Sequence, residues 1–310
     1  TYDGTTTATV QQPLMIDTDV NTGAGNEKLQ ITGLTAAFRN ANAGTNKEVV
    51  IDASKAVITG AAAGGGGATA DPDNYQVNIP SNATATIKKA ASSITINDAE
   101  WPGTKTYGDP DFSLTGVTTV GDGAVTKTSD SANVLTVDED GQATIHGAGT
   151  ANVTIRMENG TNYTAGNNSR PITVQKGTIS LNLKAGKKTD LMQRLLAVLG
   201  NVEDTYVLTL EAKGAYQDVL AGTVIFYENG QQLNQTPIPL TNGTASMEYS
   251  VPSAGTHEIS AEYVLPADGP EKENYNDPAQ VSCSFEVEKA DEDQIQIKEV
   301  DGKLYGEDPF

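Results

Sequence analysis

The side chains that could carry out chemistry in this chain are few and scattered. Cys283 is the only cysteine, and the two histidines, His146 and His257, lie far apart in the sequence. A nucleophile needs a base within hydrogen-bond reach, and neither histidine stands near a serine or cysteine in a nucleophile-elbow pattern such as Gly-x-Ser-x-Gly. We therefore predict structural histidines, a core cysteine instead of a reactive thiol, no catalytic residue set and no enzymatic activity.

Carboxylates are abundant, but no pair stands out for glycoside cleavage. The run Asp138-Glu139-Asp140-Gly141 offers the hard oxygen ligands that Ca²⁺ prefers, yet it lacks a full ligand loop and apolar strands flank it closely. A hairpin turn with solvated acids is the favoured interpretation. Acidic clusters at 71–73, 109–111 and 290–293 leave calcium-rigidified linkers as an alternative, and otherwise we expect no metal and no cofactor.

The glycine run at 64–67 does not form a phosphate loop. No strand-loop-helix context surrounds it, and no Lys-Ser or Lys-Thr pair follows it. We interpret the wider segment 61–67 as a flexible surface loop.

Composition limits the elements that could position these groups. The net charge of −20 opposes binding to nucleic acid or to an anionic membrane. The chain has 31 glycines and only 5% aromatic residues, which favours short strands joined by many turns. No apolar run approaches the roughly 20 residues of a membrane span, so we expect no membrane insertion in this segment. An all-β chain of 310 residues is long enough for two or three domains.

A repeated closing pattern divides the chain. Three Asn-Tyr pairs are each followed by a loop, an alternating strand and a lysine at nearly constant spacing: Asn74-Tyr75 with Lys89, Asn162-Tyr163 with Lys176, and Asn274-Tyr275 with Lys289. We interpret this pattern as one device used three times, with each lysine at a junction. It predicts β modules at 1–89, 90–176 and 177–289, and the first strand of a further module at 290–310.

Within the modules the apolar residues alternate with polar ones. One example is Ala151 to Met157, and others are Tyr206 to Ala212 and Ile259 to Tyr263. This period of two is typical of half-buried strands, so we predict serial β-sandwich, Ig-like or related β modules. Core-facing alternation is also expected at Ala83-Ala85-Ile87 and at Ile172-Val174.

Two local features of the third module stand out. Glu-Asn-Gly at 228–230 predicts a hairpin turn. Residues 190–199 have a capped, helically spaced apolar pattern that ends before Gly200, which predicts a short helix inserted in an otherwise β module. Plugging an open end of the core is the favoured role for this helix, and binding a partner is the alternative.

A second motif repeats at the starts of modules. KTYGDPDF at 105–112 recurs as KLYGEDPF at 303–310, and Tyr2-Asp3-Gly4 resembles the same motif without its first residue. We therefore expect Tyr2, Tyr107 and Tyr305 to occupy equivalent places in successive modules. The only tryptophan, Trp101, precedes this motif and could cap the junction between the first two modules or, alternatively, stack on a sugar.

These motifs carry a family resemblance. YDGTTTATV and NAGTNKEVVI in the first module resemble the YDG-type repeats of large bacterial surface proteins. KTYGDPDFSLTGV is similar to MBG-type repeats, and NVLTVDEDGQATIHGAGTANVTI resembles the bacterial Ig-like group-two pattern. In the third module, GTVIFYENGQQL and SAGTHEISAEY resemble the Ig-like modules of Gram-positive adhesins. The resemblance implies an extracellular, cell-wall-associated stalk or adhesin segment and transfers no catalytic residues.

Three functions remain open. The segment could be a structural spacer whose partners are the neighbouring modules, or a module that binds a host or dietary glycan or protein. It could also be an accessory region of a secreted polymer-degrading enzyme. The serial organisation and acidic surface favour the spacer.

Overall fold

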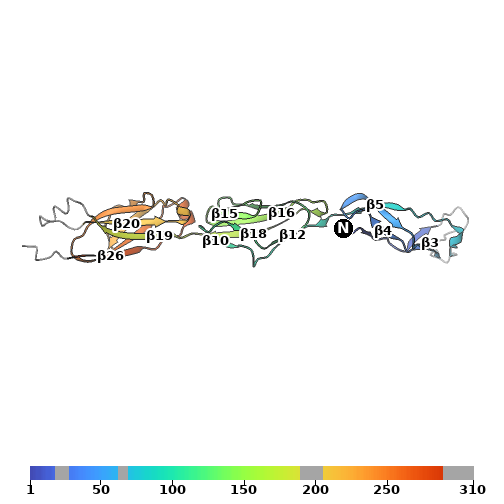
Figure 1. Ribbon diagram of the computed structural model, residues 1–310, viewed down its shortest axis with the longest axis horizontal. Coiled ribbons are helices and arrows are strands. Elements are labelled where there is room, and N and C mark those ends of the chain that lie inside the picture. The colour runs from blue at the N-terminus through green and yellow to red at the C-terminus, as the bar shows by residue number, and fades with distance from the viewer. Residues whose placement is uncertain (18–27, 62–68, 189–204, 289–310) are drawn as a thin grey trace, which may run out of the picture.

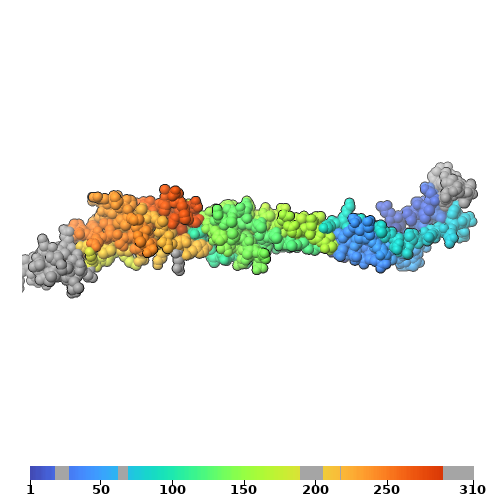
Figure 2. All heavy atoms as spheres, turned by 90° about the horizontal axis from the view of Figure 1, so that it is seen from above, coloured from blue at the N-terminus to red at the C-terminus, as the bar shows by residue number. Residues whose placement is uncertain are grey.

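The structure is a computed structural model that describes residues 1–17, 28–61, 69–188 and 205–288. Figure 1 shows a long rod in which strands from the three predicted modules follow one another along one axis. Figure 2 shows the same serial arrangement from a second direction. The predicted helix at 190–199, most of the glycine-rich segment, and the strand at 290–310 with Tyr305 lie outside the described residues.

The described chain is almost entirely β-structure, so the predicted all-β fold class is confirmed. We refer to residues 1–89, 90–176 and 177–289 as the first, second and third modules, following the repeat in the sequence. Three short helical segments also occur among the described residues, at Pro72–Asn74 (η2), Ala215–Gln217 (η3) and Pro270–Asn274 (α2).

The first module has two antiparallel sheets. One has the order β1-β4-β5-β7 and the other β2-β3-β6. The strands are β1 (Thr7–Ala8), β2 (Leu14–Asp17), β3 (Lys28–Thr32), β4 (Thr35–Phe38), β5 (Gly44–Asp52), β6 (Val57–Ala61) and β7 (Asn82–Ile87). Its core is small, because only a few apolar side chains are buried among the described residues: Leu29, Ile31, Leu34, Val49, Ala70 and Ile87.

Sequence alternation overestimated the core at the end of this module. Ile87 is buried as predicted, but Ala83 and Ala85 are exposed on β7. The prediction for the two alanines is therefore wrong. Strand β7 lies at the edge of its sheet, beside β5, and all of its residues except Ile87 are exposed.

The second module is built around a four-stranded sheet of order β10-β18-β16-β13, accompanied by smaller sheets. The buried face of β16 is the predicted alternating run, with Ala151, Val153, Ile155 and Met157 almost inaccessible to solvent. Ile172 and Val174 on β18 are buried as predicted. The strands are β8 (Ala90–Ala91), β9 (Ser93–Ile96), β10 (Thr104–Thr106), β11 (Phe112–Ser113), β12 (Val117–Val120), β13 (Val125–Ser129), β14 (Leu135–Val137), β15 (Gln142–Ile145), β16 (Gly149–Met157), β17 (Tyr163–Thr164) and β18 (Gly166–Gln175).

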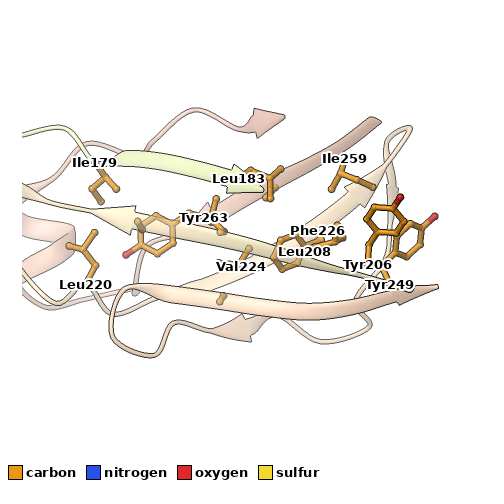
Figure 3. Packing of buried hydrophobic residues seen from close by; sticks show 14 of the residues in the cluster. Ile179, Leu183, Tyr206, Leu208, Leu220, Val224, Phe226, Tyr249, Ile259 and Tyr263 are labelled. Atoms are coloured by element: carbon orange, nitrogen blue, oxygen red, sulfur yellow. The ribbon is translucent and has the colours of Figure 1, made fainter. Parts of the chain in front are cut away.

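The third module packs the sheet β19-β20-β24 against the sheet β22-β21-β25-β26, with β23 pairing to β21. Figure 3 shows the core between them, with Leu220 and Ile179 at one end and Tyr206 and Tyr249 at the other. Alternation predicted this core correctly on both β20 and β25. The strands are β19 (Ser180–Lys187), β20 (Thr205–Lys213), β21 (Thr223–Glu228), β22 (Gln231–Gln232), β23 (Ile238–Pro239), β24 (Thr244–Ser250), β25 (Gly255–Val264) and β26 (Val281–Val287).

The predicted hairpin turn at 228–230 is confirmed. Strands β21 and β22 pair antiparallel on either side of it. Asn229 and Gly230 have φ values of 48° and 79°, the left-handed backbone that a two-residue hairpin loop requires.

Candidate functional site

The first candidate site is the junction between the first and second modules, and it is centred on Asn162. The backbone N–H of Ala43 in the first module donates a hydrogen bond of 2.8 Å to Asn162 Oδ1. The carbonyl oxygen of Asn162 accepts a second bond, also 2.8 Å, from the N–H of Ala90 where the chain enters the second module. Asn162 is therefore hydrogen-bonded both to the first module and to the strand that enters the second module.

Two further contacts complete this junction. Lys89 Nζ donates a 2.7 Å hydrogen bond across the junction to the carbonyl oxygen of Gly160. The rings of Tyr2 and Tyr163 meet edge to face, with centroids 5.4 Å apart and planes at 73°. The geometry suits the ring quadrupoles, which favour T-shaped pairs.

The junction between the second and third modules repeats these contacts at equivalent positions. Ala148 N–H donates to Asn274 Oδ1 at 2.8 Å, and Gly177 N–H donates to the Asn274 carbonyl oxygen at 2.8 Å. Lys176 Nζ reaches the carbonyl oxygen of Lys272 at 2.5 Å. The rings of Tyr107 and Tyr275 form a T-shaped pair with centroids 5.3 Å apart.

Tyr2 in the first module and Tyr107 in the second are anchored in the same way. Tyr2 N–H donates to the Lys88 carbonyl oxygen at 2.7 Å, and Tyr107 N–H donates to the Gln175 carbonyl oxygen at 2.8 Å. The acceptor in each case is the residue before the closing lysine. Tyr2 and Tyr107 are therefore equivalent, as the sequence predicted.

The local fold around Asn274 explains how its side chain is presented. Helix α2 begins with a proline at its first turn and ends at Asn274, and Tyr275 then turns into extended backbone with φ −121° and ψ 149°. Proline is favoured at a helix start because its missing N–H would be unpaired there. The abrupt end of the helix leaves Asn274 facing the preceding module.

The other half of each junction is an Ala-Gly-Thr tripeptide, which was not among the repeats predicted from the sequence. It begins β5, β16 and β25 with the glycine as the first strand residue, and that glycine pairs with the residue two places before the closing lysine. The register partners are Gly44 with Ile87, Gly149 with Val174, and Gly255 with Val287. The tripeptide also occurs at 221–223, and its distance from the closing lysine varies among the three modules, at 46, 28 and 35 residues (89−43, 176−148, 289−254), so no fixed spacing marks it in the sequence.

The second junction contains an additional cluster of tyrosines around Asp218. Asp218 Oδ2 accepts hydrogen bonds from Tyr275 Oη at 2.7 Å and from Tyr107 Oη at 3.2 Å. Tyr216, whose ring lies edge-on to Tyr107, donates from its hydroxyl to the Asp109 carbonyl oxygen at 2.6 Å. Tyr107 packs against the cores of both the second and the third modules. The cluster therefore joins the two cores directly.

Burial and the nearby carboxylate perturb the titration of these hydroxyls. Desolvation, together with the charge and hydrogen bond of Asp218, raises the pKa of Tyr107 to about 12. The same causes, burial foremost, raise the pKa of Tyr275 well above its ordinary value. Both tyrosines remain hydrogen-bond donors at any physiological pH.

A pocket of about 220 Å³ lies beside this cluster. Its lining mixes aromatic, aliphatic and acidic side chains, and no nucleophile with an adjacent base occurs in it. The lining residues are Tyr107, Asp218, Val219, Leu220, Pro270, Glu271, Asn274 and Tyr275.

A buried polar group lies in the third module beside the loop that carries Ala254. Glu228 Oε1 is 2.6 Å from His257 Nδ1, and the other oxygen of Glu228 accepts a hydrogen bond from Tyr249. His257 Nε2 lies 2.9 Å from the carbonyl oxygen of Ser253. Because both ring nitrogens face acceptors, only the protonated imidazole satisfies both contacts.

The pKa values of this pair follow from its partners. Burial disfavours the charged imidazole, but the hydrogen bond to Glu228, the hydrogen bond to the Ser253 carbonyl oxygen and the charge of Glu228 outweigh burial and raise the pKa of His257. For Glu228, burial is likewise outweighed by the hydrogen bonds from Tyr249 and His257, so its pKa is lowered. The arrangement is an ion pair beside the third core, with His257 buried and Glu228 half-buried.

The remaining candidate residues are dispersed. His146 is exposed, with Nε2 2.8 Å from Thr136 Oγ1. Cys283 packs at the edge of the third core, and burial raises the pKa of its thiol. Trp101 is buried in the second core and donates from Nε1 to the Pro171 carbonyl oxygen, so its interpretation as a junction cap is wrong.

The acidic motifs are used locally. Asp138 Oδ1 accepts the backbone N–H of Gln142, which closes the predicted turn between β14 and β15. Asp71 caps η2, and Asp109 Oδ2 accepts the N–H of Thr106. Within the described ranges, no group of three or more His, Cys, Asp or Glu side chains could hold a metal ion. Residues 290–293 lie outside those ranges.

Comparison with known proteins bears on the first module. Residues 1–85 match the family model of the YDG domain. This YDG match confirms the predicted resemblance of the first module and does not extend to the MBG-type and Ig-like resemblances of the other two. No curated protein matches the chain.

Three solved structures show a distant likeness in fold. Two are described as "Structure of surface layer protein SbsC, domains 1-6", with 12% identity, and "Crystal structure of the S-layer protein rSbsC(31-844)", with 13% identity. Both have a TM-score of 0.25, and the matches cover 77% and 84% of this chain. The chain spans about a third of the length of each, 32% and 35% respectively.

The third structure is described as "Sidekick-1 immunoglobulin domains 1-4, crystal form 1". It has 13% identity and a TM-score of 0.20, and the match covers 76% of this chain and 56% of that one. In the part of the chain that the structure describes, no helix is long and apolar enough to cross a membrane.

Proposed function

We propose that this chain is a non-catalytic spacer segment, a stalk, within a large bacterial cell-surface protein of the adhesin type. The observation that supports it is the repetition of one junction. Equivalent asparagine, lysine and tyrosine contacts join the first module to the second and the second to the third. A segment whose role is to hold something at a distance needs such a repeated, directional joint.

The joint also explains the rod shape. Each module receives its predecessor on the Asn-Tyr end and offers its Ala-Gly-Thr end to its successor, so successive modules extend one axis (Figure 1). At each junction the asparagine hydrogen bond, the lysine contact and the tyrosine pair lie at separate points. Together they oppose both bending and twisting of one module relative to the next. The acidic surface keeps such a rod soluble.

The cellular setting of the proposal comes from family likeness. The YDG match over residues 1–85 supports membership of a bacterial surface protein for the first module. The sequence resemblances of the second and third modules to MBG-type and bacterial Ig-like repeats extend the same proposal to an extracellular, Gram-positive wall-associated array. Its partners in this proposal are neighbouring modules, without metal, cofactor, nucleic acid or membrane.

The competing function is ligand binding, and its site would be the pocket beside Tyr107 and Asp218. Aromatic and acidic groups around a concavity are features of ligand sites. The buried Trp101 removes the indole platform on which a sugar-binding role had depended. An accessory region of a polymer-degrading enzyme would contain the same modules and differ only outside this segment.

Small-angle X-ray scattering together with a glycan-array screen tests the proposal. A spacer gives a radius of gyration far above the roughly 19 Å of a compact globule of this length and no selective glycan binding. A compact radius would contradict the spacer. Selective micromolar binding to one glycan class, abolished by Asp218→Ala, would favour the binding module instead.

A further inference from the structure

The pocket at the second junction is lined by two carboxylates that have capacity for further hydrogen bonds. Asp218 is half-buried, and the two tyrosine hydroxyls that bond to it both donate to the same oxygen, Oδ2. Glu271 accepts the backbone N–H of Ala221 through Oε1 at 3.1 Å. A carboxylate group offers about four lone-pair sites on its two oxygens, so both side chains can also accept hydrogen bonds from a ligand.

The residues that line this pocket supply no positive charge to match the two carboxylates. None of its described lining residues is basic. Lys272 follows Glu271 on α2, but its Nζ donates to Asp277. Lys176 lies at the same junction, and its Nζ donates to the Lys272 carbonyl oxygen. The net charge of −20 on the chain adds to the negative potential. The complementary ligand group is therefore a cation that donates hydrogen bonds.

The rest of the lining includes aliphatic surface. Leu220 is buried at one end of the third core (Figure 3), whereas Pro270 is exposed. Val219 is 72% exposed, the most exposed of the large apolar side chains that the structure describes. A hydrated metal ion would leave this surface in water, whereas the apolar stem of a lysine or arginine side chain would cover it.

The size of the pocket favours a single side chain as its occupant. Sites for drug-sized ligands enclose about 300–1,000 Å³. This pocket, at about 220 Å³, is smaller, so it suits one side chain better than an oligosaccharide. A guanidinium group presents a planar fork of N–H donors to carboxylates and also stacks on aromatic rings, whereas an ammonium group is a compact point charge. Two carboxylates beside tyrosine rings therefore favour arginine over lysine.

The junction itself forms the pocket before a ligand binds. Tyr107 comes from the second module, and the other lining residues come from the third. Tyr216 has left-handed backbone, with φ 53° and ψ 19°, which is strained for a residue other than glycine. Its hydroxyl is bonded to the Asp109 carbonyl oxygen of the second module. The segment that leads to Asp218 is therefore fixed by the docked modules, which lowers the entropy cost of binding.

We propose that this pocket binds an arginine side chain of a partner protein, with the guanidinium group at Asp218 and Glu271 and the apolar stem against Val219. Because Tyr107 belongs to the second module, the occupant contacts both modules. The inference goes beyond the spacer role and does not depend on it, since it rests on the pocket alone. Scattering tests the spacer role separately.

Titration of the full chain with Nα-acetyl-arginine amide, followed by backbone amide NMR shifts, tests the proposal. A ligand of about 15 non-hydrogen atoms with ordinary ligand efficiency has a dissociation constant of order 1 mM. Shifts are expected at Val219, Leu220 and Glu271. The citrulline analogue has the same shape without the charge and should bind at least about tenfold more weakly. No shifts at these residues at about 20 mM arginine amide, or equal binding of both ligands, would overturn the proposal.

A charge-removing variant tests the carboxylates. Glu271→Gln keeps an oxygen that can accept the Ala221 N–H but removes the negative charge, so binding of the arginine amide should weaken by about tenfold. Glu258→Gln, at an exposed position on β25, removes the same charge away from the pocket and should leave binding unchanged. Unchanged amide shifts elsewhere show that each variant keeps its fold. Undiminished binding in Glu271→Gln would overturn the assignment.

A matched pair of lysine substitutions tests the rim. Val219→Lys places a cation at the pocket and should weaken binding of the arginine amide by about tenfold. Val120→Lys, at an exposed valine on β12, adds the same charge elsewhere and should leave binding unchanged. Equal weakening in both variants would show only general attraction to an acidic chain and would also overturn the proposal.

Discussion

The two internal junctions share one backbone device but differ in the side chains around it. At the first junction Tyr2 and Tyr163 are only half-buried, and no carboxylate bonds to either hydroxyl among the described contacts. At the second junction Tyr275 is 2% exposed and shares Asp218 with Tyr107. The asparagine contact is therefore common to both junctions, whereas the buried tyrosine cluster is found at the second, which we expect to be the stiffer of the two.

The hydrophobic cores of the modules also differ between the two junctions. Tyr107 packs against the hydrophobic cores of both the second and the third modules, so this side chain bridges the two cores. The first module has few buried apolar residues among those described and no equivalent bridging side chain there. We therefore expect the rod to bend more readily at the first junction than at the second.

Replacing Tyr275 and Tyr163, one at each junction, should give the largest difference in the free energy of unfolding. Tyr275→Ala removes a buried ring and its hydrogen bond to Asp218, so the free energy of unfolding of the third module should fall by about 3–5 kcal/mol. Tyr163→Ala removes a half-exposed ring in a T-shaped pair and should cost the second module only about 0.5–1.5 kcal/mol. Denaturant unfolding, followed by amide exchange in each module, measures both. Equal losses would contradict the comparison.

The shared carboxylate should account for a smaller part of that difference. Asp218→Asn keeps the shape but removes the charge that two tyrosine hydroxyls face, so we expect a loss of about 1–3 kcal/mol in the third module. It should also lower the pKa of Tyr107 from about 12 towards 10, the ordinary value.

A matched tyrosine provides the control. Tyr263 has a pKa of about 12 because of burial and the charge of Glu271, and it should titrate unchanged in Asp218→Asn. Tyrosine ring resonances followed against pH separate the two residues. If Tyr107 and Tyr263 shift together, the effect is a general loosening of the module, and the specific role of Asp218 is wrong.

The sequence predicted more of the modules than of the way they are joined. Alternation located the cores on β16, β20 and β25, because a buried strand face requires an apolar residue at every second position. It failed for Ala83 and Ala85 because hydrophobic type alone does not say whether an edge strand reaches a core.

The junctions were predicted only in part. The spacing from tyrosine to lysine placed Lys89 and Lys176 at contacts between modules, where the structure finds them. The decisive partner of each asparagine is a backbone N–H, which carries no sequence signature of its own. The Asp218 cluster joins residues far apart in the chain, so no local pattern indicated it.

The ion pair in the third module predicts a pH dependence that the second module should lack. The raised pKa of His257 contributes stability that is present below 6.5 and is lost as pH rises through the folded pKa. The lowered pKa of Glu228 contributes stability that is present above 4.5 and is lost as pH falls through its folded value. The third module should therefore be most stable between these two limits.

Thermal unfolding across pH checks this prediction. His257→Gln should flatten the decline in the midpoint of the third module above pH 6.5, the ordinary pKa of histidine. His146→Gln, at an exposed position, should leave both profiles unchanged. A third module whose stability rises through neutral pH would contradict the protonated pair.

The junction lysines should produce the smallest effects on stability. Lys89→Met and Lys176→Met each remove one exposed contact to a carbonyl oxygen, so each should cost at most about 1 kcal/mol. Their effect should appear mainly as increased motion between modules, measured by ¹⁵N relaxation. Lys47→Met, which removes a lysine contact to Asn40 within the first module, is the control.

If one asparagine fixes the angle at each junction, distances between spin labels across the junctions test this most directly. In a Cys283→Ser background, exposed sites at Thr84 and Thr126 report on the first junction, and Thr126 with Glu258 reports on the second. We expect a single narrow distance distribution across each junction, narrower at the second, and broadening in Asn162→Ala and Asn274→Ala at the affected junction only. Broad distributions in the unmodified chain, or distributions that neither substitution changes, would contradict the claim.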